Sequence, residues 1–344
     1  MLFIYGIIGV VVFLITFYDI IWTTLSASET GPISFAIMIS YKHIGSIFKK
    51  LRLVHRILRF LGLLTFITTV LIWYILLWLA WSLIFWSSEN NVINAATGSS
   101  ANKIEKIYFT GWLIFTAGIG DYKPIGYTFQ LLTAFANCVG LVMVAITVAY
   151  LISATDAVTR QRQLAGQIGA LGGSPDQIIC NAWNGTNMET LDFNLRSLAD
   201  DISQSAQQLI RFPLIFNFHS IELLYSPVVK IAVLDEVVTI IQCCIPSEHR
   251  LTKLCNIQIR NSIDQYILAL KRIGINNEDK IKEPPLPPLQ RLTNEHIPII
   301  SELDCINNLQ EAKVLKRRKL LHCLILESAR TWDDVYFIDE NENN

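Results

Sequence analysis

The chain has 344 residues, of which 52% are hydrophobic and 17% charged, and its formal net charge is −1. This balance excludes the strongly basic class of nucleic-acid-binding chains, because phosphate-binding domains carry a basic face or stripe. Charged side chains recur every few positions from Asp156 onward, whereas the chain before Asp156 is mostly apolar. We therefore expect a membrane part followed by a soluble part, and no nucleic-acid partner.

Three apolar runs precede Asp156, at residues 1–25, 61–86 and 125–153. A helix of about 20 residues crosses the apolar core of a bilayer, so each run predicts a membrane-spanning helix. The first run has neither a basic start nor a small-residue cleavage site, and we expect it to be a helix rather than a signal peptide.

Basic residues predict the orientation of these spans. Six of them lie between the first two runs, and Arg160 and Arg162 follow the third. Because loops rich in Lys and Arg stay on the cytoplasmic side, we expect a multi-pass protein of the plasma membrane, the inner membrane of the cell. Its N-terminus would lie outside and its C-terminal part in the cytosol.

Some residues of the membrane part favour an anchoring role. The stretch from Ile44 to Leu58 places apolar residues on one side of a helix and basic residues on the other, which predicts an interfacial amphipathic helix in contact with lipid. Four tryptophans are expected to face lipid or the interface. They are Trp73, Trp78, Trp81 and Trp86. An acid within a span is a functional hypothesis, but Asp19 could equally reach the interface or bond Thr23 as an anchor.

A possible pore loop lies between the second and third runs. Residues Lys103 to Phe115 are too few to span a membrane, and they lead into Thr116-Ala117-Gly118-Ile119-Gly120-Asp121. A re-entrant half-helix explains this arrangement, and its carbonyl end would favour a cation. Gly118 and Gly120 can take positive φ angles, so consecutive carbonyls can turn to one side and line a pore. We expect Thr116, Ala117, Gly118, Ile119 and Gly120 to bind the ion and Asp121 to form a ring at the outer mouth.

This hexapeptide resembles the filter of the potassium-channel pore-loop family, which usually reads Thr-Val-Gly-(Tyr or Phe)-Gly-Asp. Four of its six residues are identical, and Asp121-Tyr122-x-Pro124 looks like the continuation in two-pore-domain and bacterial two-helix channels. The resemblance covers roughly residues 61–172. It implies a bacterial-like channel with two helices, one pore loop and an extra N-terminal transmembrane helix, assembled as a homotetramer. It also implies K⁺ as the permeant ion, no cofactor, no other metal and no enzymatic activity.

Two departures from the family pattern leave alternatives open. Ala117 stands where the family has Val, and Ile119 replaces the aromatic residue that helps to hold the pore diameter. A weakly selective monovalent cation channel is therefore one alternative. A membrane-anchored signalling or scaffold protein with a vestigial pore is another.

The third run should line the pore below the filter. By helical register the following residues turn towards the axis: Leu141, Val144, Ala145, Val148 and Ile152. An apolar constriction at Val148 and Ile152 would gate the pore by dewetting, although these residues could instead pack against the second run. Gly140 is either a hinge, as the resemblance implies, or a close-packing site. Asn137 could face the ion cavity or bond a neighbouring helix.

The part after Asp156 predicts a helical bundle. One apolar stripe predicts a helix along one face. It consists of Leu191, Leu195, Leu198, Ile202 and Leu209. We expect further helices at 228–243, 251–273 and 302–326, with Pro284–Pro288 as a stiff spacer. The function of this bundle would be regulatory, and an unknown cytoplasmic ligand or protein is its possible partner.

The sequence thus predicts an all-α membrane protein with three transmembrane helices, a re-entrant pore helix and filter, and a cytoplasmic helical domain. The expected domains are 1–60, an N-terminal transmembrane and interfacial helix; 61–155, the pore domain; and 156–344, the cytoplasmic regulatory domain.

Overall fold

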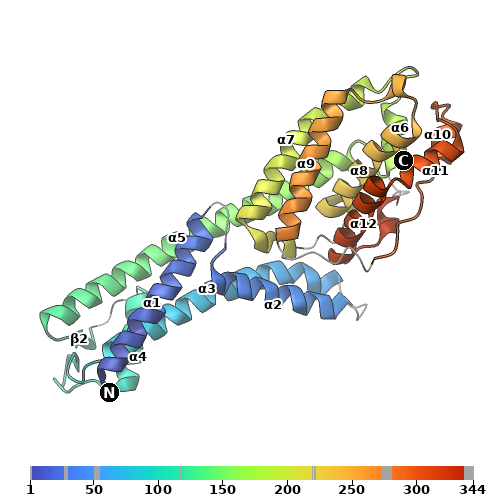
Figure 1. Cartoon of the computed structure of the whole chain (residues 1–344). Coiled ribbons are helices and arrows are strands. Elements are labelled where there is room, and N and C mark those ends of the chain that lie inside the picture. The colour runs from blue at the N-terminus through green and yellow to red at the C-terminus, as the bar shows by residue number, and fades with distance from the viewer. Residues whose placement is uncertain are drawn as a thin grey trace. The chain divides into compact units, whose positions relative to one another are not determined.

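The computed structural model describes residues 2–26, 30–49, 55–116, 118, 120–218, 220, 222–272 and 281–336 (Figure 1). The chain divides into two compact units. The first comprises Met1–Lys42 and Leu63–Thr155, and the second comprises His43–Gly62 and Asp156–Asn344. Within the described ranges the regular structure is helical, apart from two short strands that pair with each other.

The membrane-spanning candidates all lie at the N-terminal end of the chain. The elements there are α1 (Leu2–Leu25), α2 (Pro32–Lys49), α3 (His55–Trp86), β1 (Val92–Asn94), α4 (Lys103–Ile114), β2 (Tyr122–Pro124) and α5 (Tyr127–Gly169). Three of these helices are long and apolar enough to cross a membrane: α1, the Phe60–Trp86 part of α3, and α5. The three apolar runs of the sequence are thus confirmed as helices, and α5 continues to Gly169.

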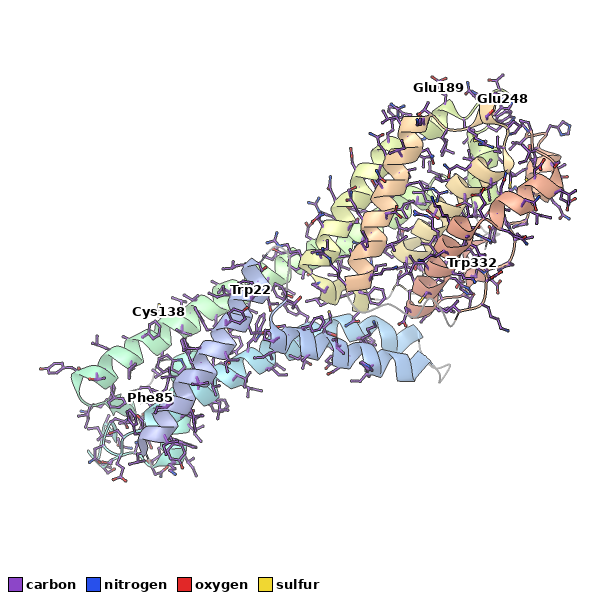
Figure 2. The ribbon with its side chains drawn as sticks, viewed as in Figure 1. Trp22, Phe85, Cys138, Glu189, Glu248 and Trp332 are labelled. Atoms are coloured by element: carbon purple, nitrogen blue, oxygen red, sulfur yellow. The ribbon has the colours of Figure 1, made fainter. Side chains whose placement is uncertain are left out.

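Aromatic side chains fill the space between these helices. Trp73 and Trp81 are almost completely buried. The ring of Trp81 packs against Phe13 at 5.7 Å and Phe135 at 5.9 Å, so it joins α1, α3 and α5. Phe85, labelled in Figure 2, packs against Phe109 of α4 at 5.4 Å. The prediction that Trp73 and Trp81 face lipid is wrong, because large rings give more contact area between helices than on their outer surface.

The basic stretch differs from the prediction as well. Residues 44–58 were expected to form one interfacial helix, but they fall into the end of α2 and the start of α3. Residues 50–54 between them lie outside the described residues. Helix α2 begins at Pro32, well before the basic residues, because Pro suits the first turn of a helix, where no hydrogen-bonding N–H is needed.

The second unit is built from short and medium helices. They are α6 (Pro175–Ala182), α7 (Glu189–Arg211), η1 (Pro213–Asn217), η2 (Leu223–Tyr225), α8 (Pro227–Cys244), η3 (Ser247–His249), α9 (Lys253–Arg272), α10 (Gln290–Asn294), α11 (Glu302–Leu309), α12 (Ala312–Glu327) and η5 (Trp332–Val335). Figure 1 shows α7 and α9 side by side, and α8 next to α9 and α12.

Helix α8 is the core of this unit. Nearly all of its residues are buried, including Lys230, Asp235 and Glu236, because α6, α9, α11 and α12 all pack on it. The apolar stripe predicted along α7 is confirmed, since its five members are all buried. The helices predicted at 228–243 and 251–273 are confirmed as α8 and α9.

The last predicted helix is two helices. Residues 302–326 divide into α11 and α12, because Gln310 ends the first and Glu311 takes an extended conformation before the second. The break lets the Asn308 amide donate a 2.9 Å hydrogen bond to the Cys243 carbonyl at the end of α8. The proline run packs on the same unit, since the Pro285 carbonyl accepts a bond from Arg318.

Two neighbouring acids in α8 pair with two neighbouring arginines in α12. Asp235 accepts from Arg317 at 2.8 Å and from Arg260 of α9 at 2.7 Å. Glu236 pairs with both ends of the Arg318 guanidinium, at 2.6 and 3.0 Å. Trp332, labelled in Figure 2, covers this guanidinium with its ring. Burial opposes ionisation of Asp235, but the two arginines outweigh it and hold the pKa of Asp235 below its usual value.

Candidate ion-conduction site

Helix α4, which leads into the hexapeptide, has a well-defined start. The Asn102 side chain accepts from the Glu105 backbone N–H at 3.0 Å, and the Glu105 carboxylate accepts from the Asn102 N–H at 2.7 Å. This reciprocal cap satisfies two donors that a helix start otherwise leaves free. Lys106 is buried and donates to the carbonyls of Ser88 and Glu89, which ties α4 to the segment after α3. The predicted helix from Lys103 is therefore confirmed, and it ends at Ile114.

Helix α3 holds α4 through polar bonds as well as apolar contacts. The Trp78 indole donates to the Ile107 carbonyl at 2.9 Å, and the Ser82 and Thr110 hydroxyls lie 2.8 Å apart. Trp86 donates to the Lys103 carbonyl at 3.1 Å. These bonds were not predicted from the sequence, although tryptophan in an apolar helix usually needs a partner for its N–H. The orientation of α4 is thus fixed at both of its ends.

The backbone after α4 turns sharply. Thr116 has a φ of 57° and Gly118 has a φ of 62°, both in the left-handed region, whereas Gly120 does not. Of the two glycines that could take positive φ, Gly118 does so and Gly120 does not. Ala117 and Ile119 lie outside the described residues. A non-glycine residue such as Thr116 adopts this conformation at a cost of about 1–3 kcal/mol, and such strain is concentrated at functional sites.

The hexapeptide is little covered by the rest of the chain. Thr116, Gly118, Gly120 and Asp121 are all exposed. An added Cβ atom at Gly118 or Gly120 would meet no atom within 4 Å. This surface is available to a ligand or to other copies of the chain.

The segment after the hexapeptide is anchored to the loop before α4. Strand β2 pairs antiparallel with β1, with Tyr122 opposite Asn94 and Pro124 opposite Val92. The Asp121 carbonyl accepts from the Ala95 N–H at 2.7 Å. The Tyr122 ring packs 6.1 Å from Tyr108 of α4. Both ends of the exposed segment are therefore held, which a pore lining requires.

Helix α5 lies against the C-terminal end of α4 at Gly140. A methyl group there would overlap the Ile114 carbonyl oxygen and would lie 3.1 Å from the Leu113 carbonyl oxygen. Of the two interpretations of Gly140, this contact favours close packing, and α5 is one continuous helix through that position. The hinge interpretation remains a prediction.

One face of α5 is largely exposed within the described part of the chain. Asn137 is exposed, as are Leu141, Val144 and Ala145, and Val148 and Ile152 are 51% and 64% exposed. These residues repeat every three or four positions, so they share one side of the helix. The opposite side carries the buried residues Met143, Tyr150 and Ala154. The side predicted to line a pore is therefore the side that faces away from the chain's own core.

Asp19 is the centre of a buried polar cluster that joins α1, α2 and α3. One of its carboxylate oxygens accepts from the backbone N–H groups of Ile33 and Ser34 at 2.7 and 3.3 Å. The other accepts from the Ser34 hydroxyl at 2.6 Å and from the Trp73 indole at 2.8 Å. Thr23, its expected partner, instead accepts from Gly31. Asp19 therefore caps the start of α2, and its anchoring role is confirmed through other partners.

No group of three or more His, Cys, Asp or Glu side chains in the described ranges could hold a metal ion.

Comparison with known proteins gives the family. No family model matches the chain, and no solved structure matches it. A curated protein of Bacillus subtilis (strain 168), the uncharacterized membrane protein YdjJ, is 30% identical over 336 residues, which cover 95% of each of the two chains. With its three apolar helices, the chain belongs to the same family of membrane proteins as YdjJ.

Proposed function

We propose that the chain is one subunit of a homotetrameric potassium channel that conducts K⁺ passively through residues 116–121. The observation that carries this proposal is the backbone after α4. A capped 12-residue helix ends directly before an exposed segment with positive φ at Thr116 and Gly118, and this segment lies between two candidate membrane spans. The identity of the hexapeptide residues and the geometry of the segment thus support the same function.

The exposed hexapeptide supports assembly from several copies. Gly118 and Gly120 have no neighbouring atoms within reach of a Cβ, and each chain supplies one loop. A closed filter needs four such loops around one axis, and cyclic symmetry supplies them from identical subunits. The exposed face of α5 would then lie along the same axis, with Asn137 near the ion cavity.

Ion binding in this proposal depends on backbone oxygen atoms. Carbonyl groups from Thr116 to Gly120, together with the Thr116 hydroxyl, replace the water shell of K⁺. The C-terminal end of α4 points toward the ion, and the negative end of the helix dipole favours a cation there. Four copies of Asp121 raise the local cation concentration at the outer mouth.

The second part of the proposal is gating. Val148 and Ile152 form the narrow apolar ring that stops ions when it loses water. Residues 156–344 lie in the cytosol and set the position of α5, which continues into them as one helix. In this arrangement the N-terminus lies outside the plasma membrane, in agreement with the basic residues that follow α1 and those in the part of α5 after its apolar run.

Potassium flux into liposomes tests the filter. Gly118→Ala should reduce flux from the purified full chain to the background level, because alanine is strained at a φ of 62° and its methyl group narrows the pore. Gly98→Ala is the matched control, because Gly98 has a φ of 68° and also has no atom within 4 Å of an added Cβ. Equal flux from both variants would rule out residues 116–121 as the ion path.

A weakly selective monovalent cation channel is the second candidate. Ile119 favours it, because an aliphatic residue supplies neither the ring nor the hydroxyl with which the family's aromatic residue holds the filter at a fixed diameter. The reversal potential in mixed K⁺ and Na⁺ separates the two candidates. A potential close to the K⁺ equilibrium value supports K⁺ selectivity, and one midway between the two equilibrium values supports the second candidate.

A further inference from the structure

The second unit contains an open cavity that no step of the proposed conduction uses. It lies where the end of α8, the start of α9 and the junction of α11 and α12 meet, and its volume is about 640 Å³. Its polar lining residues are Gln242, Ser247, Arg250, Lys253, Asn256, Asn308 and Glu311. Sites for small molecules typically measure about 300–1,000 Å³. By contrast, the cavity beside Tyr225 and Tyr266 holds only about 50 Å³, enough for water but not for a metabolite.

Two helices begin at the wall of this cavity, which we call the α9/α12 pocket. Helix α9 starts at Lys253 and has 20 residues, and helix α12 starts at Ala312 and has 16. Helix α12 has no acidic residue in its first turn, and the Glu311 side chain makes no capping bond to it. The start of a helix carries free N–H groups and a partial positive charge, which favour an anion. At α9 the Thr252 hydroxyl already accepts from the Cys255 N–H at 3.4 Å, so the start of α12 is the freer of the two.

Two basic side chains add to this positive potential. The Nε of Arg250 donates to the Ile245 carbonyl at 2.7 Å, which holds the guanidinium at the pocket wall and leaves its outer nitrogens available. Lys253 makes no hydrogen bond or ion pair with any other residue in the described ranges. Against these two positive charges stands the single carboxylate of Glu311. The pocket therefore has an excess of positive charge.

The pocket also offers hydrogen-bond acceptors. The Asn256 side-chain oxygen is buried and has no partner among the described residues. The Asn308 amide donates its N–H group to Cys243, so its oxygen is left to accept. A buried acceptor without a partner is unfavourable until a donor reaches it. A bound molecule therefore needs a donor as well as a negative charge.

We propose that the α9/α12 pocket binds a small organic anion that carries a phosphate or carboxylate group and at least one hydroxyl group. The anionic group lies between Arg250, Lys253 and the start of α12, and the hydroxyl group donates to Asn256. Gln242 connects this ligand to the core, because its side-chain oxygen accepts at 2.9 Å from Arg260, which also binds Asp235. The inference does not depend on conduction through residues 116–121.

Ligand-induced stabilisation of the full chain in detergent tests this inference, with glycerol 3-phosphate as the probe. It should raise the unfolding temperature in a concentration-dependent way, because a ligand that binds the folded state stabilises it. Glycerol and sodium chloride at matched concentrations should leave it unchanged. Lys253→Gln should weaken binding of the probe about tenfold, as expected for the loss of a charged hydrogen bond, and Lys253→Arg should restore it.

Lys271→Gln is the matched control, because it removes the same charge from the last turn of the same helix, outside the pocket. Its affinity for the probe should equal that of the unaltered chain. No stabilisation by glycerol 3-phosphate, or an equal loss of affinity in Lys253→Gln and Lys271→Gln, would overturn the proposal. Because the assay measures binding and not flux, its result is distinct from that of the liposome experiment.

Discussion

At the scale of single residues, acidic side chains hold together segments that are far apart in the sequence. The buried Asp19 carboxylate accepts hydrogen bonds from four donors in place of water, and two of these donors are backbone N–H groups at the start of α2. A buried carboxylate is tolerated only when its oxygens are satisfied in this way. Asp192 in the second unit does the same for α9, since it accepts from the Thr252 N–H at 2.9 Å and from the Thr252 hydroxyl at 2.8 Å.

Replacement of Asp19 by asparagine should destabilise the chain. The amide has one acceptor oxygen instead of two and carries no charge, so several of the four donors lose their partner, at a cost of about 2–4 kcal/mol. Thermal unfolding in detergent measures the effect. Asp156→Asn is the control, because Asp156 forms only an exposed ion pair with Arg160 and should contribute less than about 1 kcal/mol. Equal unfolding temperatures for the two variants would contradict the anchoring role.

The hydrogen bonds to Asp192 should make the free energy of unfolding of the chain depend on pH. Burial alone would raise its pKa, but hydrogen bonds from Thr252 and Arg196 outweigh burial and hold the pKa of Asp192 below its usual value. The unfolded chain then binds more protons, so this stabilisation is present above about pH 4 and is lost as the pH falls through the lower folded-state pKa.

The difference in stability between the unaltered chain and Asp192→Asn measures this effect. It should be about 1–3 kcal/mol at neutral pH and should shrink below about pH 4. Unfolding temperatures recorded from pH 7 to pH 3 give the comparison. A difference that stays constant over this range would show that the carboxylate charge of Asp192 contributes nothing.

At the scale of secondary structure, α4 and α5 meet near the candidate filter at a glycine. The Ile114 carbonyl lies against Gly140, so the position of α5 and that of the end of α4 are mechanically linked. The last carbonyls of α4 therefore lie beside α5 at a position that has no side chain.

Gly140→Ala should displace the end of α4 and reduce K⁺ flux by at least tenfold, because the methyl group would overlap a backbone oxygen that cannot move independently of the helix. Gly166→Ala makes the same change in the same helix, where the nearest atom to the new Cβ would be 3.8 Å away. It should keep full flux and slightly raise the unfolding temperature, since alanine favours the helix over glycine. Loss of flux in both variants would contradict the packing argument.

The sequence predicted elements better than it predicted their partners. Apolar runs and periodic stripes depend on nearby residues, so α1, α3, α5, α7, α8 and α9 were all found. The division into α11 and α12 was missed, because no glycine or proline marks the break at Gln310. The hydrogen bond beside the break joins the Asn308 amide to the Cys243 carbonyl, which is far away in the sequence. Trp73 was assigned to the wrong side of α3, because its partner Asp19 is 54 positions away. For the candidate site, the residue type at Gly118 indicated that positive φ is possible there. The positive φ of Thr116 is visible only in the folded backbone.

At the scale of the whole molecule, the residues proposed for conduction lie on exposed surfaces of the chain. The exposed faces of the hexapeptide and of α5 carry the residues proposed for conduction, whereas the core of the first unit lies on the other side of α5. In the proposed channel these outward-facing residues meet those of the other copies around one axis.

Mixed assembly tests the number of copies. When unaltered chains and Gly118→Ala chains are co-expressed in equal amounts, only tetramers without an altered loop should conduct at the normal level. Random assembly leaves about one sixteenth of tetramers unaltered, so K⁺ flux should fall to roughly that fraction. Flux that falls only to half would mean that each chain conducts independently, and native mass spectrometry of the same sample would show the assembly size.

The paired charges of α8 and α12 also impose an order on the folding of the second unit during synthesis. Glu236 leaves the ribosome 82 residues before Arg318, the partner that permits its burial. At roughly 5–20 residues per second, this carboxylate waits about 4–16 s for its arginine. During that interval water must solvate it, so α8 cannot yet occupy the centre of its bundle. Helices α7 and α9 can associate first, and the nascent second unit closes only when the arginines of α12 have emerged.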